Sequence, residues 1–500
     1  MDSLAGLAAG FQEILTAERV FYCLLGCLAG TVVGVLPGLG PLAGMTLLLP
    51  LTFKLDATTG LIILAGIFYG SMYGGSTTSI LMRIPGESAS IITCIDGYEM
   101  ARKGRAGPAL MIAAVGSFFA GTISIVGLML FAPPLAEVML SVGPPAEFIL
   151  MLLALLVLGF ISGGPPLKTF IMITLGLAIG TIGLDPFTAL PRFTFGQLDL
   201  TEGVSFVALA IGLFGISEIL LNFEAGKEVR PIQPKLRDLV PRLSDLKEAA
   251  GPIGRGTIIG FALGMIPGAS HVISTFISYA LEKRIAKRPE EFGRGAIAGV
   301  AGPEAANNAT TGSAMIPLLT LGIPAISATA ILLSAMLVHG VQPGPLLITE
   351  HPQLFWGLIA SMYIGNVILL ILNLPLVGIF VNLLRIPYPH LAMIILIASV
   401  IGVYSVRSSV FDIWVMIAFG VVGYAIRKFD YDPAPFLLAL VLGDRLEVNL
   451  RRSLAISNGD FSIFAQGSAA RVLLVALCVL IVLQGIAWGL GWKSGRVKVE

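Results

Sequence analysis

Two short runs of hydroxyl and amide side chains interrupt apolar stretches of this 500-residue chain and could bind ions. The first is Ser76-Thr77-Thr78, and the second extends from Asn307 to Thr311. Side-chain oxygens of Ser, Thr and Asn, with carbonyls of unwound backbone, are hard ligands that suit Na⁺. The N–H groups at a helix N-terminus suit a carboxylate. The runs therefore indicate a site for Na⁺ and an organic anion, although small polar residues also ease helix packing.

A proline–glycine break precedes each polar run, and the two breaks lie 230 positions apart, at Pro37 and Pro267. Proline removes a backbone donor and glycine accepts positive φ, so the chain turns sharply there. We interpret each break as the tip of a re-entrant hairpin, over residues 21–54 and 255–283. The polar runs should then break two spanning segments, 61–84 and 296–321, into half-helices around a protein-lined cavity.

These two kinds of interruption give the predicted site. The residues expected to bind the anion are Pro37, Gly38, Gly40, Ser76, Thr77, Pro267, Gly268, Ser270 and Asn307. The residues expected to bind Na⁺ are Thr78, Asn308, Thr310 and Thr311.

Four ionisable residues lie near the interruptions, and each has two interpretations. Arg83 could meet an anionic substrate or snorkel to the membrane interface. Glu87 and Glu304 could bind a cation or a proton, and Glu304 could instead cap a helix N-terminus. His271 could carry a proton or lie at the interface.

Composition indicates a membrane protein. The chain is 56% hydrophobic and 12% charged, against roughly 25% charged in an average soluble domain. Apolar runs recur near the length of a bilayer span, which predicts about a dozen spans. The net charge of +1 gives no indication of nucleic-acid binding.

Cys23 and Cys27 lie one helical turn apart, but apolar surroundings favour buried small residues over a metal pair. No Walker A, nucleophile elbow, HExxH or dinucleotide motif occurs, so we expect neither an ATP-driven pump nor an enzyme.

Further matches follow the breaks in the same order, including Ile84-Pro85 with Ile323-Pro324. Basic loops then alternate between the halves. In the first half the loop at Arg102–Arg105 is basic, whereas its counterpart in the second half is not. For the preceding pair of loops, 282–295 in the second half is basic, whereas 53–59 in the first half is not. Because Lys and Arg gather in cytoplasmic loops, the halves should be inverted repeats. This scheme leaves Arg445, Arg451 and Arg452 on the outer side, against the rule. The expected divisions are a first repeat (1–223), a cytoplasmic connector (224–250), a second repeat (251–468) and a C-terminal span and tail (469–500).

Five motifs strongly resemble the large membrane subunit of tripartite tricarboxylate transporters (TctA-like proteins). They are GVLPGLGP (34–41), GIFYGSMYGGSTTSIL (66–81), GVAGPEAANNA (299–309), IPLLTLGIP (316–324) and HGVQPGP (339–345). The second tip departs from the expected pattern at Pro-Gly-Ala-Ser-His, which leaves open whether His271 or a backbone group faces the site.

The resemblance implies a bacterial inner-membrane importer of carboxylates that works with a small four-helix membrane subunit and a periplasmic solute-binding protein. It also implies an elevator-type fold of the ion-transporter superfamily. Other expected partners are the lipid bilayer and a second copy of the chain. We therefore expect an all-α polytopic protein, a secondary transporter subunit driven by a cation gradient, with Na⁺ as coupling ion and no other cofactor. The alternatives are proton coupling, a channel built on re-entrant loops, and a hydrolase using Ser270 and His271.

Overall fold

The computed structural model describes residues 3–36, 40–161, 165–225, 232, 239, 241–267, 271–383 and 388–489. Nearly all of these residues are helical, and among them one two-stranded antiparallel sheet is formed. The predicted all-α class is confirmed. Six helices are long and apolar enough to cross a membrane, and six shorter apolar helices accompany them within the described ranges.

The elements before the connector include a long and almost fully buried helix, α4. The α-helices are α1 (Ser3–Ile14), α2 (Ala17–Val35), α3 (Gly40–Thr52), α4 (Ala57–Met82), α5 (Thr93–Met100), α6 (Ala106–Leu140), α7 (Pro144–Ile161), α8 (Pro166–Gly180), α9 (Phe206–Ala210) and α10 (Ser217–Ala225). Shorter elements are η1 (Ser88–Ile91), η2 (Ala101–Arg105), β1 (Gly183–Leu184), β2 (Pro191–Arg192), η3 (Leu198–Leu200) and η4 (Ile211–Ile216). In the sheet, Gly183 pairs with Arg192 and Leu184 with Pro191.

The elements after the connector begin with a second helical hairpin. They are α11 (Leu243–Gly264), α12 (His271–Ile285), η6 (Pro289–Glu291), α13 (Ala298–Ser313), α14 (Met315–Leu321), α15 (Ser327–Val338), α16 (Leu347–Glu350), α17 (Pro352–Asn373), α18 (Val377–Leu383), α19 (Tyr388–Arg407), α20 (Val410–Lys428), α21 (Ala434–Ile456), η7 (Phe461–Ala465) and α22 (Ser468–Gly489). Because α11 starts at Leu243, the second hairpin begins inside the segment expected to be connector.

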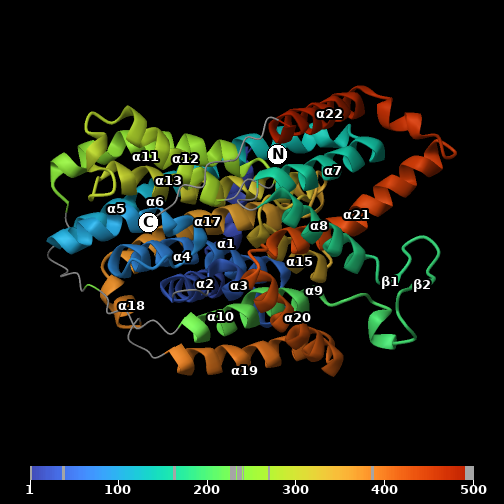
Figure 1. Ribbon diagram of the computed structural model, residues 1–500, viewed down its shortest axis with the longest axis horizontal. Coiled ribbons are helices and arrows are strands. Elements are labelled where there is room, and N and C mark those ends of the chain that lie inside the picture. Colours follow the sequence, from blue (N-terminus) through green and yellow to red (C-terminus); the bar gives the residue numbers. More distant parts are fainter. Residues whose placement is uncertain are drawn as a thin grey trace.

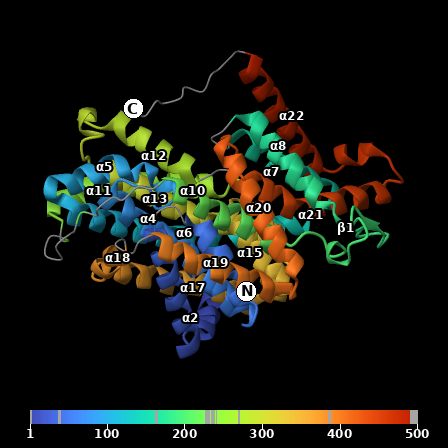
Figure 2. The same cartoon turned by 60° about the horizontal axis from the view of Figure 1, so that its bottom comes forward.

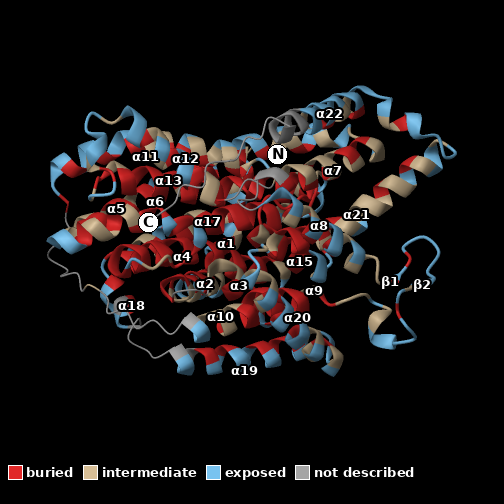
Figure 3. Ribbon diagram, in the orientation of Figure 1, coloured by how far each residue is buried: buried red, intermediate tan, exposed pale blue. Residues whose placement is uncertain are grey.

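The buried centre contains α4, α13 and α15, whereas α19 and α22 lie at the periphery (Figures 1 and 3). The peripheral helices expose large apolar side chains three or four residues apart, which places them on one helix face. These are Ile394, Ile397 and Ile401 on α19, and Val475, Val479 and Val482 on α22. Apolar faces of this kind suit contact with lipid, as expected of a multi-pass membrane protein.

Three glycines of α2, spaced by four residues, allow its backbone to lie against α4. A Cβ on each would come within 2.5 Å of a carbonyl oxygen of α4. α11 packs on α13 through glycines at the equivalent places, with the corresponding distances at most 2.7 Å. The pairs are Gly26–Ile63, Gly30–Ile67 and Gly34–Ser71 in the first half, and Gly256–Gly302, Gly260–Ala306 and Gly264–Thr310 in the second. Small residues at this spacing are the usual device for close helix contact in membranes. The same packing unit therefore occurs twice, at matching positions.

The predicted break of the 61–84 segment at its polar run is wrong. α4 continues as a helix through the polar run to Met82. The second segment also stays helical through Asn307–Thr311, and only Ala314 separates α13 from α14. The glycines around the first run serve packing instead of breaking the helix: a Cβ at Gly74 would lie 2.4 Å from Thr31 O of α2.

The turns that follow these helices match in backbone geometry. Arg83 (φ 58°, ψ 25°) ends α4 and Gly322 (φ 65°, ψ 24°) ends α14, both in the left-handed region. An Ile-Pro pair follows each. Further on, Glu87 N–H donates to Ser90 Oγ at 3.4 Å, and Ile326 N–H donates to Thr329 Oγ1 at 3.1 Å. The Ile-Pro match in the sequence therefore marks two equivalent turns.

The two hairpins enter from opposite ends of α4. The ends of the first hairpin meet through Arg19 and Asp56, 3.8 Å apart, and Asp56 caps the N-terminus of α4. The ends of the second lie beside the loop after α5: Arg105 pairs with Asp245 at 2.8 Å, and Lys103 donates to Arg294 O at 2.6 Å. The C-terminal end of α4 lies on this side as well. Ile232, which precedes α11 in the chain, donates its N–H to Leu81 O in the last turn of α4 at 3.0 Å.

A loop carrying β1 and β2 projects from the body (Figures 1 and 2) and is held by charged side chains. Arg451 of α21 lies 2.6 Å from Asp185 and 2.9 Å from Glu447, and Arg192 lies 2.8 Å from Glu447. The Arg451 guanidinium, with backbone N–H groups of the loop, holds the pKa of Asp185 well below its usual value. Arg445 likewise donates to Pro343 O at 3.2 Å. Two of the arginines that depart from the positive-inside rule, Arg445 and Arg451, therefore bond to other parts of the chain.

We expect Arg451→Ala to make this projecting loop more sensitive to protease without lowering the stability of the body. The ion pairs tie the loop to α21, whereas Arg452→Ala, at an exposed neighbouring position, should leave cleavage unchanged. Because the pKa of Asp185 is lowered, the pairing persists above the usual aspartate pKa of about 3.9 and is lost only as the pH falls below it. Limited proteolysis at neutral pH would measure the difference, and equal cleavage of the two variants would contradict it.

Candidate functional site

The carboxylate of Glu304 joins the two halves of the chain at the centre of the molecule. Its side chain is 1% exposed on α13. Ser76 Oγ of α4 donates to Glu304 Oε2 at 2.5 Å, and Thr93 Oγ1 of α5 donates to Glu304 Oε1. Because α13 begins at Ala298, Glu304 lies well inside the helix and does not cap its N-terminus.

A second buried carboxylate lies beside the first. Glu87 caps η1 by accepting the Ala89 N–H at 2.6 Å, and it accepts Asn307 Nδ2–H of α13 at 3.2 Å. The other polar atom of that amide, Asn307 Oδ1, is buried and has no hydrogen-bond partner among the residues that the structure describes. Neither Glu87 nor Glu304 forms an ion pair within the described part of the chain. This network of two carboxylates, two hydroxyls and one amide, from both halves, is the candidate site.

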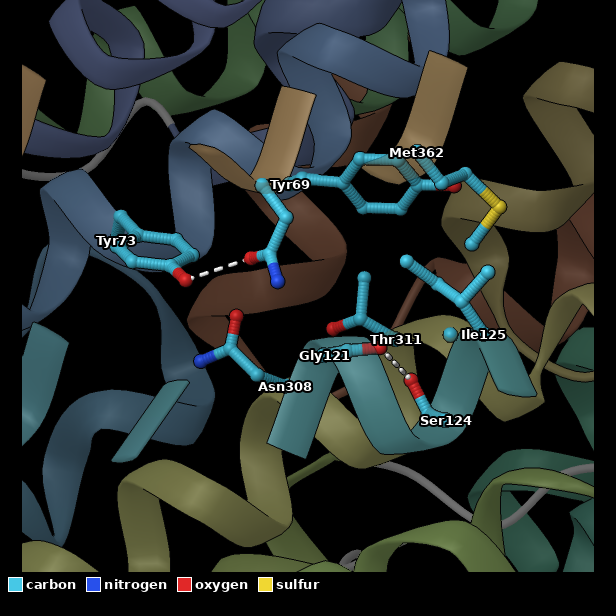
Figure 4. Close-up of a pocket in the computed structure, with 10 residues that line it drawn as sticks. Tyr69, Tyr73, Gly121, Ser124, Ile125, Asn308, Thr311 and Met362 are labelled. Carbon is cyan, nitrogen blue, oxygen red and sulfur yellow. Dashed lines mark hydrogen bonds between the residues drawn. The ribbon is translucent and has the colours of Figure 1, made fainter. Parts of the chain in front are cut away.

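A small cavity lies between α4, α6, α13 and α17 (Figure 4). Tyr69 and Tyr73 of α4 face Asn308 and Thr311 of α13 across it, and Tyr73 O–H donates to Asn366 Oδ1 at 2.8 Å. The cavity is about 20 Å³, enough for about one water molecule. The space is therefore too small for an organic anion of several heavy atoms.

A second cavity, of about 10 Å³, lies on the other side of Tyr73. Ser76 and Thr77 line it together with Ser117 of α6 and Asn373 of α17. Asn308 Nδ2–H donates to Ser117 Oγ at 2.7 Å. Polar residues of α4 and α13 therefore both lie beside Ser117 of α6, with small cavities between them.

Of the other six predicted anion-binding residues, the structure describes Gly40 and Pro267. Gly40 (φ 57°) begins α3, and Pro267 lies in the turn after α11. Pro37, Gly38, Gly268 and Ser270 lie outside the described residues. The assignment of these six residues to the substrate stays a prediction.

The four residues predicted to bind Na⁺ point to different places. Thr78 Oγ1 donates to Val35 O at 2.6 Å, beside the first tip. Thr310 Oγ1 donates to Gly260 O at 3.1 Å, inside the second hairpin. Asn308 and Thr311 line the first cavity. The three threonine hydroxyls thus contact the hairpins, whereas the Asn308 amide contacts Ser117 of α6. The role of all four residues toward Na⁺ stays a prediction.

The remaining ionisable candidates take separate positions. Arg83 is exposed, with its guanidinium 5.9 Å from the centre of the Tyr98 ring. His271 is buried, and its Nε2 lies 3.0 Å from Thr311 Oγ1. Cys23 and Cys27 are buried free thiols, as predicted.

Sequence reasoning missed Thr93, Ser117, Asn366 and Asn373. The two asparagines carry a signal that could have found them, because they are seven residues apart inside an apolar span and therefore share one helix face. Thr93 and Ser117 carry none, since single hydroxyls are common in membrane helices.

Comparisons with known proteins agree with the resemblance in the sequence. A family model described as the tripartite tricarboxylate transporter TctA family matches residues 20–438. An uncharacterized 52.8 kDa protein of Agrobacterium vitis, from the TAR-I ttuC′ 3′ region, is 49% identical over 485 residues, 97% of each chain. An uncharacterized protein of the TAR-II ttuC′ 3′ region of the same organism is 49% identical over 241 residues, 48% of this chain and 99% of its own. No solved structure matches the chain.

Proposed function

Because the chain belongs to the tripartite tricarboxylate transporter TctA family, we propose that it carries an organic carboxylate across the bacterial inner membrane by secondary active transport. A periplasmic binding protein delivers the substrate, and a cation gradient, most simply of Na⁺, drives uptake. The observation that carries the proposal is the buried network of Glu304, Ser76, Thr93, Glu87 and Asn307 between the two halves. A small membrane subunit, and a second copy of this chain, complete the proposed assembly.

Alternating access requires two related halves that present opposite ends to the membrane. The repeated glycine contacts, the matching turns at Arg83 and Gly322, and the entry of the hairpins from opposite ends of α4 all support inverted repeats. In an elevator mechanism, the hairpins and the helices packed on them move together against the remaining helices. The small size of the cavities, about 20 and 10 Å³, favours such a carrier over a channel, because an open channel needs a continuous path for its ions.

Orientation gives a direct prediction. We expect single cysteines at Lys103 and Lys287 to react with an impermeant thiol reagent only when the cytoplasmic face is accessible, because both lie in basic loops. Lys54→Cys, at the end of the first hairpin, should react from the periplasm and is the matched control. Labelling of Lys103→Cys and Lys54→Cys from the same side would contradict the inverted arrangement.

Transport itself tests the function. The chain should be reconstituted into liposomes with the small membrane subunit and binding protein encoded beside it, and supplied with labelled di- and tricarboxylates. We expect uptake above the external concentration that needs the binding protein and stops when the cation gradient is collapsed. Equilibration without accumulation would identify a channel, and product formation without uptake would identify an enzyme.

A further inference from the structure

Glu304 and Glu87 lack the positive partner that two other buried acids of this protein have. Glu282 pairs with Arg255 at 2.7 Å, and Asp245 pairs with Arg105 at 2.8 Å. Glu304 and Glu87, which are 1% and 7% exposed, accept hydrogen bonds only from neutral groups in the described part of the chain. An ionised carboxylate at membrane depth without a positive partner is costly. A cation at this place would balance the charge.

The amide of Asn307 supplies an independent sign of a ligand. Its side chain is 1% exposed, and among the described residues no donor reaches its Oδ1. Asn307 lies three residues after Glu304 on α13, so the two side chains share a helix face. Its Nδ2 donates to Glu87 at 3.2 Å. The unpartnered oxygen therefore belongs to an amide that is bonded to one acid and lies on the same helix face as the other.

From these positions we infer that Glu304, Glu87 and Asn307 Oδ1, with the Ser76 and Thr93 hydroxyl oxygens, bind one Na⁺ ion. The inference rests on the proposed function, since it names the coupling site of that carrier. Both hydroxyls donate their hydrogen to Glu304 and retain lone pairs for a cation. All of the donor atoms are hard oxygens, which suit Na⁺.

The chemistry of these residues favours a monovalent metal ion over other cations. Within the described ranges no group of three or more His, Cys, Asp or Glu side chains converges, and the softer transition metals prefer imidazole and thiolate ligands. A proton would remove the charge of one carboxylate, whereas Na⁺ would balance that charge and use the other oxygens, including Asn307 Oδ1, as ligands.

The site also explains how ion binding could prepare the protein for substrate. The proposed ligands come from α4, η1 and α5 of the first half and from α13 of the second. Na⁺ would therefore hold the two halves together at the place where the cavities meet the polar runs. Loss of the ion would leave two facing carboxylates, whose repulsion favours separation of the same elements.

The test measures Na⁺ binding on the purified full chain in detergent, without substrate. Thermal unfolding should be followed as NaCl replaces choline chloride at constant ionic strength and pH, with ²²Na⁺ binding as a second readout. We expect Na⁺, and not K⁺ or choline, to raise the unfolding temperature, because a ligand of the folded state stabilises it. Asn307→Ala and the isosteric Glu304→Gln should each weaken Na⁺ affinity by about tenfold or more, and Thr93→Val by a smaller factor.

Matched controls are Asn449→Ala and Asp412→Asn, a buried amide and a buried acid on α21 and α20, which should bind Na⁺ like the parent chain. Wild-type affinity in folded Glu304→Gln and Asn307→Ala would overturn the site, as would stabilisation by acid pH with no effect of Na⁺. Either result leaves carboxylate accumulation by the whole assembly to be judged separately. Conversely, Na⁺ binding as expected without any accumulation would uphold the ion site and contradict the proposed transport.

Discussion

Gly260→Ala should destabilise the protein strongly, although it adds only one methyl group. A Cβ at this position would lie 2.1 Å from Ala306 O, which is backbone of the facing helix and cannot rotate away. Overpacking of this kind costs about 3 kcal/mol, because α11 must move away from α13 and give up its other contacts. The midpoint of thermal unfolding in detergent would measure the effect.

Gly254→Ala is the matched control, because it lies in the same helix and a Cβ there would meet nothing within 4 Å. Alanine should be neutral or stabilising at that site by up to about 1 kcal/mol, since glycine is the poorer helix former. Gly30→Ala should behave like Gly260→Ala, because its Cβ would lie 2.4 Å from Ile67 O in the equivalent packing unit. Equal stabilities of Gly254→Ala and Gly260→Ala would refute the close contact.

Sequence reasoning singled out two residues that meet in the candidate network, but it did not predict the backbone that carries them. It selected Ser76 and Asn307 as partners across the two halves, and both belong to one buried network. The predicted helix break was wrong because glycine in a membrane helix can either permit a break or admit a closely packed neighbouring helix. Composition alone does not separate these two roles. Gly74 admits the backbone of α2, and Ser76 returns a hydrogen bond to Met72 O at 3.0 Å within an intact helix.

The role of the carboxylates also depended on information that is not local in sequence. Glu87 and Glu304 are 217 positions apart (304 − 87), and only the fold brings Asn307 between them. Sequence spacing places Glu304 and Asn307 on one helix face but does not show what that face meets. The assignment of Na⁺ to uncharged oxygens alone rested on the apparent lack of acids in the polar runs. With two acids beside those runs, the candidate cation site lies around Glu304 instead.

Glu304→Gln should abolish most gradient-driven uptake while leaving the chain folded and assembled. The amide keeps the shape of the side chain but removes the charge that we propose holds the coupling ion. It also turns one of the two acceptors for Ser76 and Thr93 into a donor. Hydrogen bonds to a charged group contribute about 1.5–3 kcal/mol, so the loss of one of them, together with the ion, should lower the rate of uptake by about 100-fold or more.

The comparison should use liposomes that contain equal amounts of the parent chain, Glu304→Gln, Ser76→Ala and Asp412→Asn. Ser76→Ala removes one donor and leaves the carboxylate, so its uptake should fall by about tenfold. Asp412→Asn removes a buried acid of α20, outside the network, and should transport normally. Counterflow exchange of substrate at equal Na⁺ on both sides separates binding from coupling: Glu304→Gln should retain part of this exchange while losing accumulation. If Glu304→Gln accumulates substrate like the parent chain, the carboxylate serves packing between α13, α4 and α5, and the coupling ion must bind elsewhere.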